Sequence, residues 1–149
     1  MIPDRSRTPK FQTSSASLFD ASAIVNLLIS QGGRIIDIVT GNWTLDLTVY
    51  EVGNAVWKLN TIKSKITSAE ADNLLRNLLD IVADRIRLIS SSEIDHLSTI
   101  RIAREEKLSY YDATYLSIAM TRNLLLVTDH RRLYNSAKKY VKVLTSSHF

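Results

Sequence analysis

The chain contains no cysteine, and this absence limits the chemistry that it can carry. None of its 149 residues is a cysteine, which excludes a disulfide framework and a thiolate-bound metal. No apolar run approaches the roughly eighteen residues needed to cross a bilayer, so we expect no association with a membrane. The polar N-terminal segment MIPDRSRTPKFQTSSAS lacks the apolar core of a signal peptide. We therefore expect a cytoplasmic protein whose residues 1–16 form a flexible basic tail.

The composition is typical of one globular domain. Hydrophobic residues make up 45% of the chain, close to the average for soluble proteins, and the length allows a sizeable core. We therefore assign residues 17–149 to a single domain. The net charge of +4 suits a polyanionic partner such as nucleic acid. This indication is weak, because many basic proteins bind no nucleic acid.

Short apolar runs alternate with longer segments of helical periodicity. Thr48 is a plausible N-cap for one helix, Thr67 or Ser68 with Glu70 forms a capping box for the next, and Gly32-Gly33 ends the first. The pattern predicts strands at 17–19, 43–47, 85–90, 124–128 and 141–145, and helices at 22–31, 34–40, 49–63, 67–84, 91–107, 111–123 and 129–140. Such alternation indicates the α/β class, with a parallel sheet covered on both faces.

Four acidic residues lie near strand ends or helix starts. Asp20 and Asp129 directly follow the apolar runs SLF and LLLVT, while Glu51 and Asp112 lie in the first turns of predicted helices. Functional crevices of open parallel sheets lie beyond the carboxyl ends of the strands. We therefore expect these carboxylates to converge at one edge of the sheet.

Each of these acids also has a simpler interpretation. Asp112 and Asp129 could merely cap helices, which is the commoner use of such residues. Asp20 could cap the helix that follows it through the N–H of Ser22 or Ala23. Glu51 is flanked by apolar helix positions, so we expect it to be at least partly buried.

The cluster is more informative than its members. Converging carboxylates stay ionised only if a positive charge lies among them. Oxygen ligands in a chain without cysteine favour Mg²⁺ or Mn²⁺. Such an ion can activate a water molecule and hold a phosphodiester oxygen. A metal site explains why Asp20 would occupy a position at the end of a buried strand.

Four stretches of the sequence resemble the motifs of the PIN-domain ribonucleases, especially the VapC-type toxins of prokaryotic toxin–antitoxin pairs. The resemblance runs from about residue 17 to the C-terminus, and each motif alone is weak. The four stretches are FDASAIVNLL with Asp20, LTVYEVGNAVWK with Glu51, LSYYDATYLSIAM with Asp112 and LLLVTDHRRLYNSA with Asp129.

The resemblance implies a three-layer α/β/α PIN-like fold with a mainly parallel sheet of four or five strands. It also implies an endoribonuclease that depends on Mg²⁺ or Mn²⁺, with one or two ions held by Asp20, Glu51 and Asp112 and with Asp129 in support. A small VapB-type antitoxin and a homodimer are the implied protein partners. Ser22, Asn54 and Thr128 would hold the carboxylates in place through hydrogen bonds, and Lys58, Arg131 and Arg132 are candidates for contacts with the RNA backbone.

The fourth motif departs from the family pattern. Family members often read Thr-x-Asp before the last helix, whereas this chain reads Thr128-Asp129-His130. Asp129 could still serve, His130 could ligate the metal, or the site could use three acids. The simplest interpretation of His130 is a solvent-exposed residue at a helix start. The simplest interpretation of Lys58, Arg131 and Arg132 is a charged surface that contacts only solvent.

Other classes of protein fit the sequence less well. A non-catalytic PIN-like module that binds RNA or protein would keep the fold, and an RNA-processing nuclease could act outside a toxin–antitoxin pair. A haloacid dehalogenase-like phosphotransferase needs a second aspartate two residues after Asp20, where Ser22 stands. A receiver domain needs an aspartate after the third strand, where RLISSSE offers only Glu93.

Overall fold

Five parallel strands form one sheet in the computed structural model, which describes residues 16–149. The strand order is β3-β2-β1-β4-β5, and all four pairings are parallel. The bounds are β1 (Ser17–Phe19), β2 (Trp43–Leu45), β3 (Arg87–Ile89), β4 (Leu125–Val127) and β5 (Val143–Leu144). The prediction of a parallel α/β sheet is confirmed. The tail predicted for residues 1–16 lies, except for Ala16, outside the described residues.

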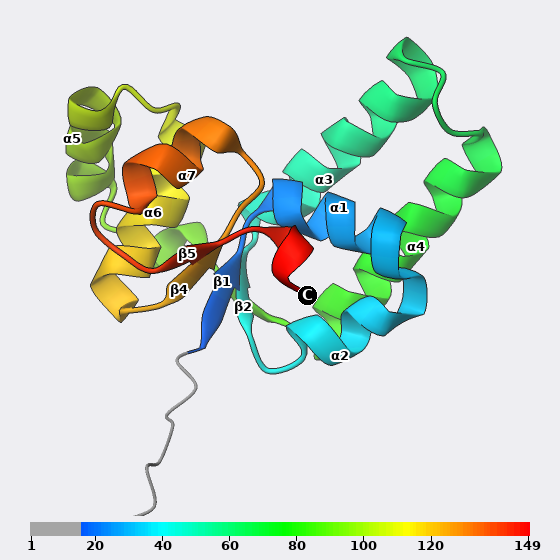
Figure 1. Cartoon of the computed structure of the whole chain (residues 1–149), viewed down its shortest axis with the longest axis horizontal. Coiled ribbons are helices and arrows are strands. Elements are labelled where there is room, and N and C mark those ends of the chain that lie inside the picture. The colour runs from blue at the N-terminus through cyan, green and yellow to red at the C-terminus, as the bar shows by residue number, and fades with distance from the viewer. Residues whose placement is uncertain (1–15) are drawn as a thin grey trace, which may run out of the picture.

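Helices cover both faces of this sheet and make a three-layer α/β/α arrangement, as the resemblance implied (Figure 1). One face carries α1 (Ala21–Gln31), α2 (Ile35–Val39), α3 (Leu47–Trp57) and α4 (Ser68–Asp84). The other carries α5 (His96–Glu106), α6 (Tyr110–Arg122) and α7 (Arg131–Ala137). Short 3-10 turns occur at η1 (Gly32–Arg34), η3 (Ser91–Glu93) and η4 (Ser146–His148).

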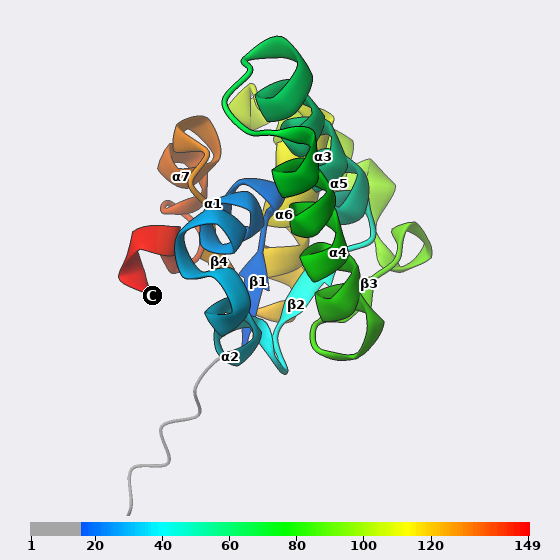
Figure 2. The same cartoon turned by 90° about the vertical axis from the view of Figure 1, so that its right-hand side faces the viewer.

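The central strands divide their side chains between two separate cores. Leu18 and Leu126 pack with α5, α6 and α7, whereas Phe19 and Val127 pack with α1 to α4. This division follows from the strand geometry, because successive side chains point to opposite faces. The buried side chains of β1 and β4 are therefore apolar on both faces of the sheet. The carboxyl ends of these two strands meet between α1 and α7 (Figures 1 and 2).

Local capping signals fix most helix ends. The capping box at Thr67 and Glu70 is present, and Gly32, with φ +54°, ends α1 as predicted.

The predicted N-cap at Thr48 is wrong. α3 begins at Leu47 after Asp46, whose side chain accepts from the Leu47 N–H, and the Thr48 hydroxyl is buried inside the domain. A buried hydroxyl finds its partners in the tertiary structure, which the local sequence does not reveal.

Two predicted helices are each divided. The segment predicted at 91–107 forms η3 and then α5, because the Asp95 side chain caps a new helix by accepting from the Ser98 N–H. The segment predicted at 49–63 forms α3 and then one π-helical turn, η2 (Lys58–Ile62). α3 and α4 run side by side as a hairpin (Figures 1 and 2).

One stretch of the described residues, Ala21–Val39, is long and apolar enough by composition to cross a membrane. The expectation that no apolar stretch would be long enough to cross a bilayer is therefore wrong. In the structure it comprises α1, η1 and α2, and Ile24, Leu27 and Ile35 belong to the core beneath the sheet. The packing of a core helix accounts for this apolar composition.

Candidate metal centre

Asp20 lies at the point where β1 ends and α1 begins. Its Oδ1 accepts hydrogen bonds from the Ala23 N–H at 2.9 Å and the Ser22 hydroxyl at 2.7 Å, and its Oδ2 accepts from the Thr128 hydroxyl. The residue is only 3% exposed. Asp20 is therefore the N-cap of α1, as the simpler interpretation proposed. Each carboxylate oxygen has two lone pairs, so capping does not prevent Asp20 from binding a cation.

Glu51 projects from the first part of α3, and a chain of hydroxyl groups holds it. The Tyr115 hydroxyl donates to Glu51 Oε1 at 2.8 Å and lies 2.6 Å from the Thr48 hydroxyl, which in turn contacts the Thr44 hydroxyl at 2.7 Å. Thr44, Thr48 and Tyr115 are all buried. Glu51 is half-buried, as expected, because this network anchors its carboxylate at the domain interior.

Replacing Tyr115 with phenylalanine removes the hydroxyl that joins this network to Glu51. We expect Tyr115→Phe to lower the free energy of unfolding by about 1–3 kcal/mol, because the buried Thr48 hydroxyl loses one of its two partners and keeps only the bond with Thr44. Urea denaturation would measure this change. Ser117→Ala, at another buried hydroxyl of α6, is the matched control. Equal stability of Tyr115→Phe and the wild type would contradict the role given to the network.

Asp112 lies in the first turn of α6. Ser109 is the N-cap of this helix and its hydroxyl accepts from the Asp112 N–H, so Asp112 itself is not the cap. Asp112 Oδ2 lies 2.7 Å from His130 Nδ1, and the His130 side chain is 52% exposed. His130 is therefore exposed at the start of α7, as the simplest interpretation proposed, and its imidazole in addition pairs with the Asp112 carboxylate.

These three carboxylates line a single pocket of about 260 Å³. The remaining lining residues include Ser22, Ser109, Tyr115 and His130. The pocket lies at the carboxyl edge of the sheet, because Asp20 directly follows β1, as the crevice rule predicted.

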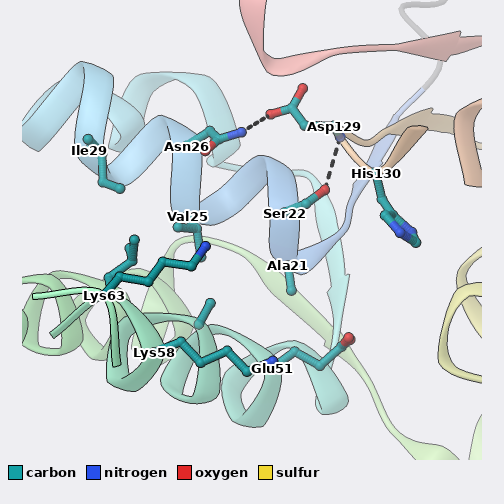
Figure 3. A pocket seen from close by; sticks show the side chains of 12 residues that line it. Ala21, Ser22, Val25, Asn26, Ile29, Glu51, Lys58, Lys63, Asp129 and His130 are labelled. Carbon is teal, nitrogen blue, oxygen red and sulfur yellow. Dashed lines mark hydrogen bonds between the residues drawn. The ribbon is translucent and has the colours of Figure 1, made fainter. Parts of the chain in front are cut away.

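Asp129 has different neighbours from the other three acids. Its Oδ2 accepts from Asn26 Nδ2 at 2.6 Å and its Oδ1 accepts from the Ser146 N–H at 2.8 Å. Figure 3 shows its carboxylate directed toward Asn26, away from Glu51 and His130. Asp129 does not cap α7 either, because His130 holds the N-cap position. The Asp129 carboxylate thus joins α1 to the turn that follows β5.

The predicted supporting residues differ in their contacts. Ser22 and Thr128 donate to Asp20, and their hydroxyls also accept from the Asp129 and His130 N–H groups at 2.9 and 3.0 Å. Asn54 is exposed on α3 and makes no side-chain hydrogen bond within residues 16–149. Its role stays a prediction. Arg131 and Arg132 are exposed at the start of α7.

Burial raises the pKa values of the three carboxyl groups. Burial raises the pKa of Asp20 to about 6, although hydrogen bonds from Thr128, Ala23 and Ser22 oppose the shift. Burial also raises the pKa of Glu51 against the Tyr115 hydrogen bond, and that of Asp112 against the nearby His130. The charges add to this effect, because Asp112 raises the pKa of Asp20 and both aspartates raise that of Glu51. A cation bound among the three carboxylates would favour their ionised forms.

The donor set fits a hard divalent ion. As the side chains lie, no three acidic or histidine side chains within residues 16–149 form a complete ligand set. Mg²⁺ does not require such a set, because it keeps several waters and often binds only one or two carboxylates. The pocket offers carboxylate oxygens and room for water, so its chemistry suits Mg²⁺ or Mn²⁺.

Sequence reasoning missed two members of the pocket, Tyr115 and the pairing of His130 with Asp112. Tyr115 follows Asp112 by three positions on α6, and residues three apart share a helix face. That spacing could have placed Tyr115 beside the acids. The orientation of His130 had no such signal, because it depends on how the loop after β4 meets α6.

Known proteins resemble this chain in sequence. Exonuclease VapC9 of Pyrobaculum aerophilum is 33% identical over 101 residues, which are 68% of this chain and 71% of that protein. Ribonuclease VapC3 of the same organism is 29% identical over 131 residues, which are 85% of this chain and 95% of that protein. No protein-family model matches the chain.

Solved structures resemble it as well. The crystal structure of PAE2754 from Pyrobaculum aerophilum superposes with a TM-score of 0.71 at 27% identity, covering 90% of this chain and 92% of the other. FitAcB from Neisseria gonorrhoeae gives a TM-score of 0.54 at 18% identity over 89% of this chain and 99% of the other, which concerns the fold alone. The fold and the acidic pocket at its edge define a PIN-type domain. Within that class, the chain belongs to the VapC family.

Proposed function

We propose that this protein is a metal-dependent endoribonuclease that hydrolyses phosphodiester bonds of RNA. The observation that carries the proposal is the meeting of Asp20, Glu51 and Asp112 in one pocket of a VapC-family chain. The names of the relatives, exonuclease VapC9 and ribonuclease VapC3, support a nuclease and leave the position of the cut to be measured.

In this proposal one or two Mg²⁺ or Mn²⁺ ions occupy the pocket of the three carboxylates. The bound metal supplies an acidified water and an anchor for a phosphate oxygen. The chain itself supplies orientation. Ser22 and Thr128 fix Asp20, Tyr115 fixes Glu51, and His130 fixes Asp112. Asp129 supports the site indirectly, because it holds α1 against the turn after β5.

We further propose that the protein is the toxin of a VapBC-type pair, acts in the cytoplasm and forms a homodimer. Membership of the VapC family supports a small VapB-type antitoxin as its partner. Size-exclusion chromatography with light scattering would measure the oligomeric state. A short reading frame next to this one would favour the toxin, whereas its absence would favour an RNA-processing nuclease outside such a pair.

The test of this function compares linear and circular single-stranded RNA with Mg²⁺, with Mn²⁺ and with a chelator. We expect both substrates to be cut with either metal, because a circular RNA has no ends and reports internal cleavage. Cutting of the linear RNA alone would indicate an exonuclease. Cleavage that persists in the chelator would contradict the metal site. Binding of RNA without any product would instead identify a non-catalytic PIN-like module.

A further inference from the structure

A second hollow adjoins the acidic pocket. Its volume is about 460 Å³, and Ser22, Glu51 and His130 line both spaces. It extends between α1 and the far part of α3, as Figure 3 shows from close by. We name this hollow the lateral groove. Because the two spaces share a boundary, a chain-like ligand anchored in the acidic pocket can continue into the lateral groove.

The π-helical turn η2 places two lysines on this groove. The Lys63 N–H donates to the Lys58 carbonyl at 2.9 Å. In such a turn, residues five positions apart lie on the same side of the helix. In a regular α-helix Ile62 would follow Lys58 on the same face. Ile62 is instead 64% exposed, and both lysines line the groove. The widened turn therefore turns a lysine, rather than an isoleucine, toward the groove.

The two lysines have no anionic partner among residues 16–149. No salt bridge of the described chain involves either side chain. Two ammonium groups on one wall repel each other unless an anion lies between or beside them. Two carboxylates, those of Glu51 and Asp129, also line the groove. Tyr115 holds Glu51 on the side of the acidic pocket, and Asn26 and the Ser146 N–H hold Asp129 on the side of α1. The lateral groove thus offers two lysines without a salt bridge next to the acidic pocket.

Apolar side chains also line the groove. They are Val25 and Ile29 of α1 and Leu59 of η2, and Ile29 is 54% exposed. An apolar wall beside two cations suits a ligand with an anionic backbone and flat apolar rings. Single-stranded RNA has this combination, because unpaired bases expose their faces to apolar and aromatic side chains while lysines bind the phosphates.

We propose that the lateral groove binds the nucleotide adjacent to the scissile phosphate of a single-stranded RNA. Lys58 and Lys63 hold the neighbouring phosphate, and Val25, Ile29 and Leu59 contact the ribose or base. This inference rests on the proposed nuclease function, because that function places the scissile phosphate in the acidic pocket. It adds a binding subsite with a defined ligand, a phosphate of the unpaired strand.

Fluorescence anisotropy with a fluorescein-labelled, twelve-nucleotide single-stranded RNA tests the subsite. Every protein carries Asp20→Asn, to prevent turnover, and the buffer contains Mg²⁺. We expect Lys58→Gln/Lys63→Gln to raise the Kd at least tenfold. The slope of log Kd against log salt should fall by about 0.7, because the two lysines hold one phosphate and each neutralised phosphate of a single strand contributes about 0.7. Lys58 and Lys63 are both exposed, so their substitution should retain the fold of the Asp20→Asn parent, which a melting curve checks.

The control is Lys138→Gln/Lys142→Gln, which removes the same charge at two exposed positions outside the groove. We expect its Kd to stay within about twofold of the parent, since distant charges are screened at about 0.1 M salt. Equal affinities of the two double variants would overturn the proposal and would leave the groove to another occupant, such as a peptide.

Photocrosslinking with a 4-thiouridine-containing RNA maps the contact directly. We expect crosslinked peptides from residues 21–29 or 55–63, and crosslinks confined to other segments would overturn the proposal. The two proposals can fail separately. Lysine-dependent binding without cleavage of either linear or circular RNA would remove the nuclease function alone, whereas cleavage with lysine-independent binding would remove the subsite alone.

Discussion

Asp20→Asn is expected to abolish RNA cleavage and, in a chelator, to increase the stability of the protein. Loss of this proposed metal ligand should lower the cleavage rate about a hundredfold to a thousandfold, the range found when one electrostatic contact is removed from an enzyme site. The amide can keep the N-cap bond with the Ala23 N–H, and the Thr128 hydroxyl can turn to accept from it. The local structure should therefore survive the substitution.

The stability gain follows from the raised pKa of Asp20. Its pKa is about 6 in the folded protein against an ordinary value of 3.8, so the folded state binds the proton more tightly than the unfolded state. In wild-type protein without metal, this contribution to stability is present below about pH 4 and is lost as the pH rises through about 6. The loss amounts to about 3 kcal/mol at most. The asparagine of the variant does not ionise, so we expect a gain of about 1–3 kcal/mol at pH 7.

Thermal or urea unfolding in a chelator measures the difference in the free energy of unfolding between Asp20→Asn and the wild type. The variant should be more stable at pH 7, and the difference should be absent at pH 4. Asp72→Asn, at an exposed position of α4, is the matched control and should change neither stability nor cleavage. Cleavage by Asp20→Asn at the wild-type rate would remove Asp20 from the site. A variant less stable than wild type at pH 7 would contradict the cost assigned to the buried charge.

The affinity for Mn²⁺ is expected to fall about tenfold between pH 7 and pH 5. In the proposed site the metal would bind the ionised carboxylates and compete with protons. With a pKa of about 6 for Asp20, the ionised fraction changes little above pH 7 and falls about tenfold for each further unit below pH 6. The raised pKa values of Glu51 and Asp112 make the decrease steeper.

Isothermal titration calorimetry with MnCl₂ at several pH values measures this dependence, and buffers of different ionisation enthalpy count the protons released. Asp72→Asn should reproduce the wild-type profile, and Asp20→Asn should bind Mn²⁺ much more weakly at every pH. An affinity that stays constant from pH 7 to pH 5 would contradict a site built on these buried carboxylates.

Much of the fold could be predicted from local patterns. The apolar runs that became β1 and β4 are buried on both faces of the sheet, so they read as continuous hydrophobic segments. The capping box of α4 is likewise a signal within four consecutive residues. Errors occur where a tertiary contact competes with the local signal. Thr48 has the side chain of a good N-cap, but its hydroxyl pairs with Tyr115, far away in the sequence.

The candidate site divides in the same way. Asp20, Glu51 and Asp112 could be brought together from the sequence, because strand ends and helix starts meet at one edge of a parallel sheet. Asp129 and His130 could not be assigned from neighbouring positions alone. One directs its side chain to Asn26 and the other to Asp112. Only the path of the loop after β4 decides which residue faces the pocket.

The amino-acid sequence by itself determined the alternation of strands and helices, the parallel sheet and the edge where the carboxylates gather, because periodicity and burial are encoded residue by residue. The tertiary structure alone decided that His130 faces Asp112, that Tyr115 holds Glu51, and that a π-helical turn brings Lys63 beside Lys58. These contacts depend on the relative placement of separate elements and on the geometry of one irregular turn, which no local pattern specifies.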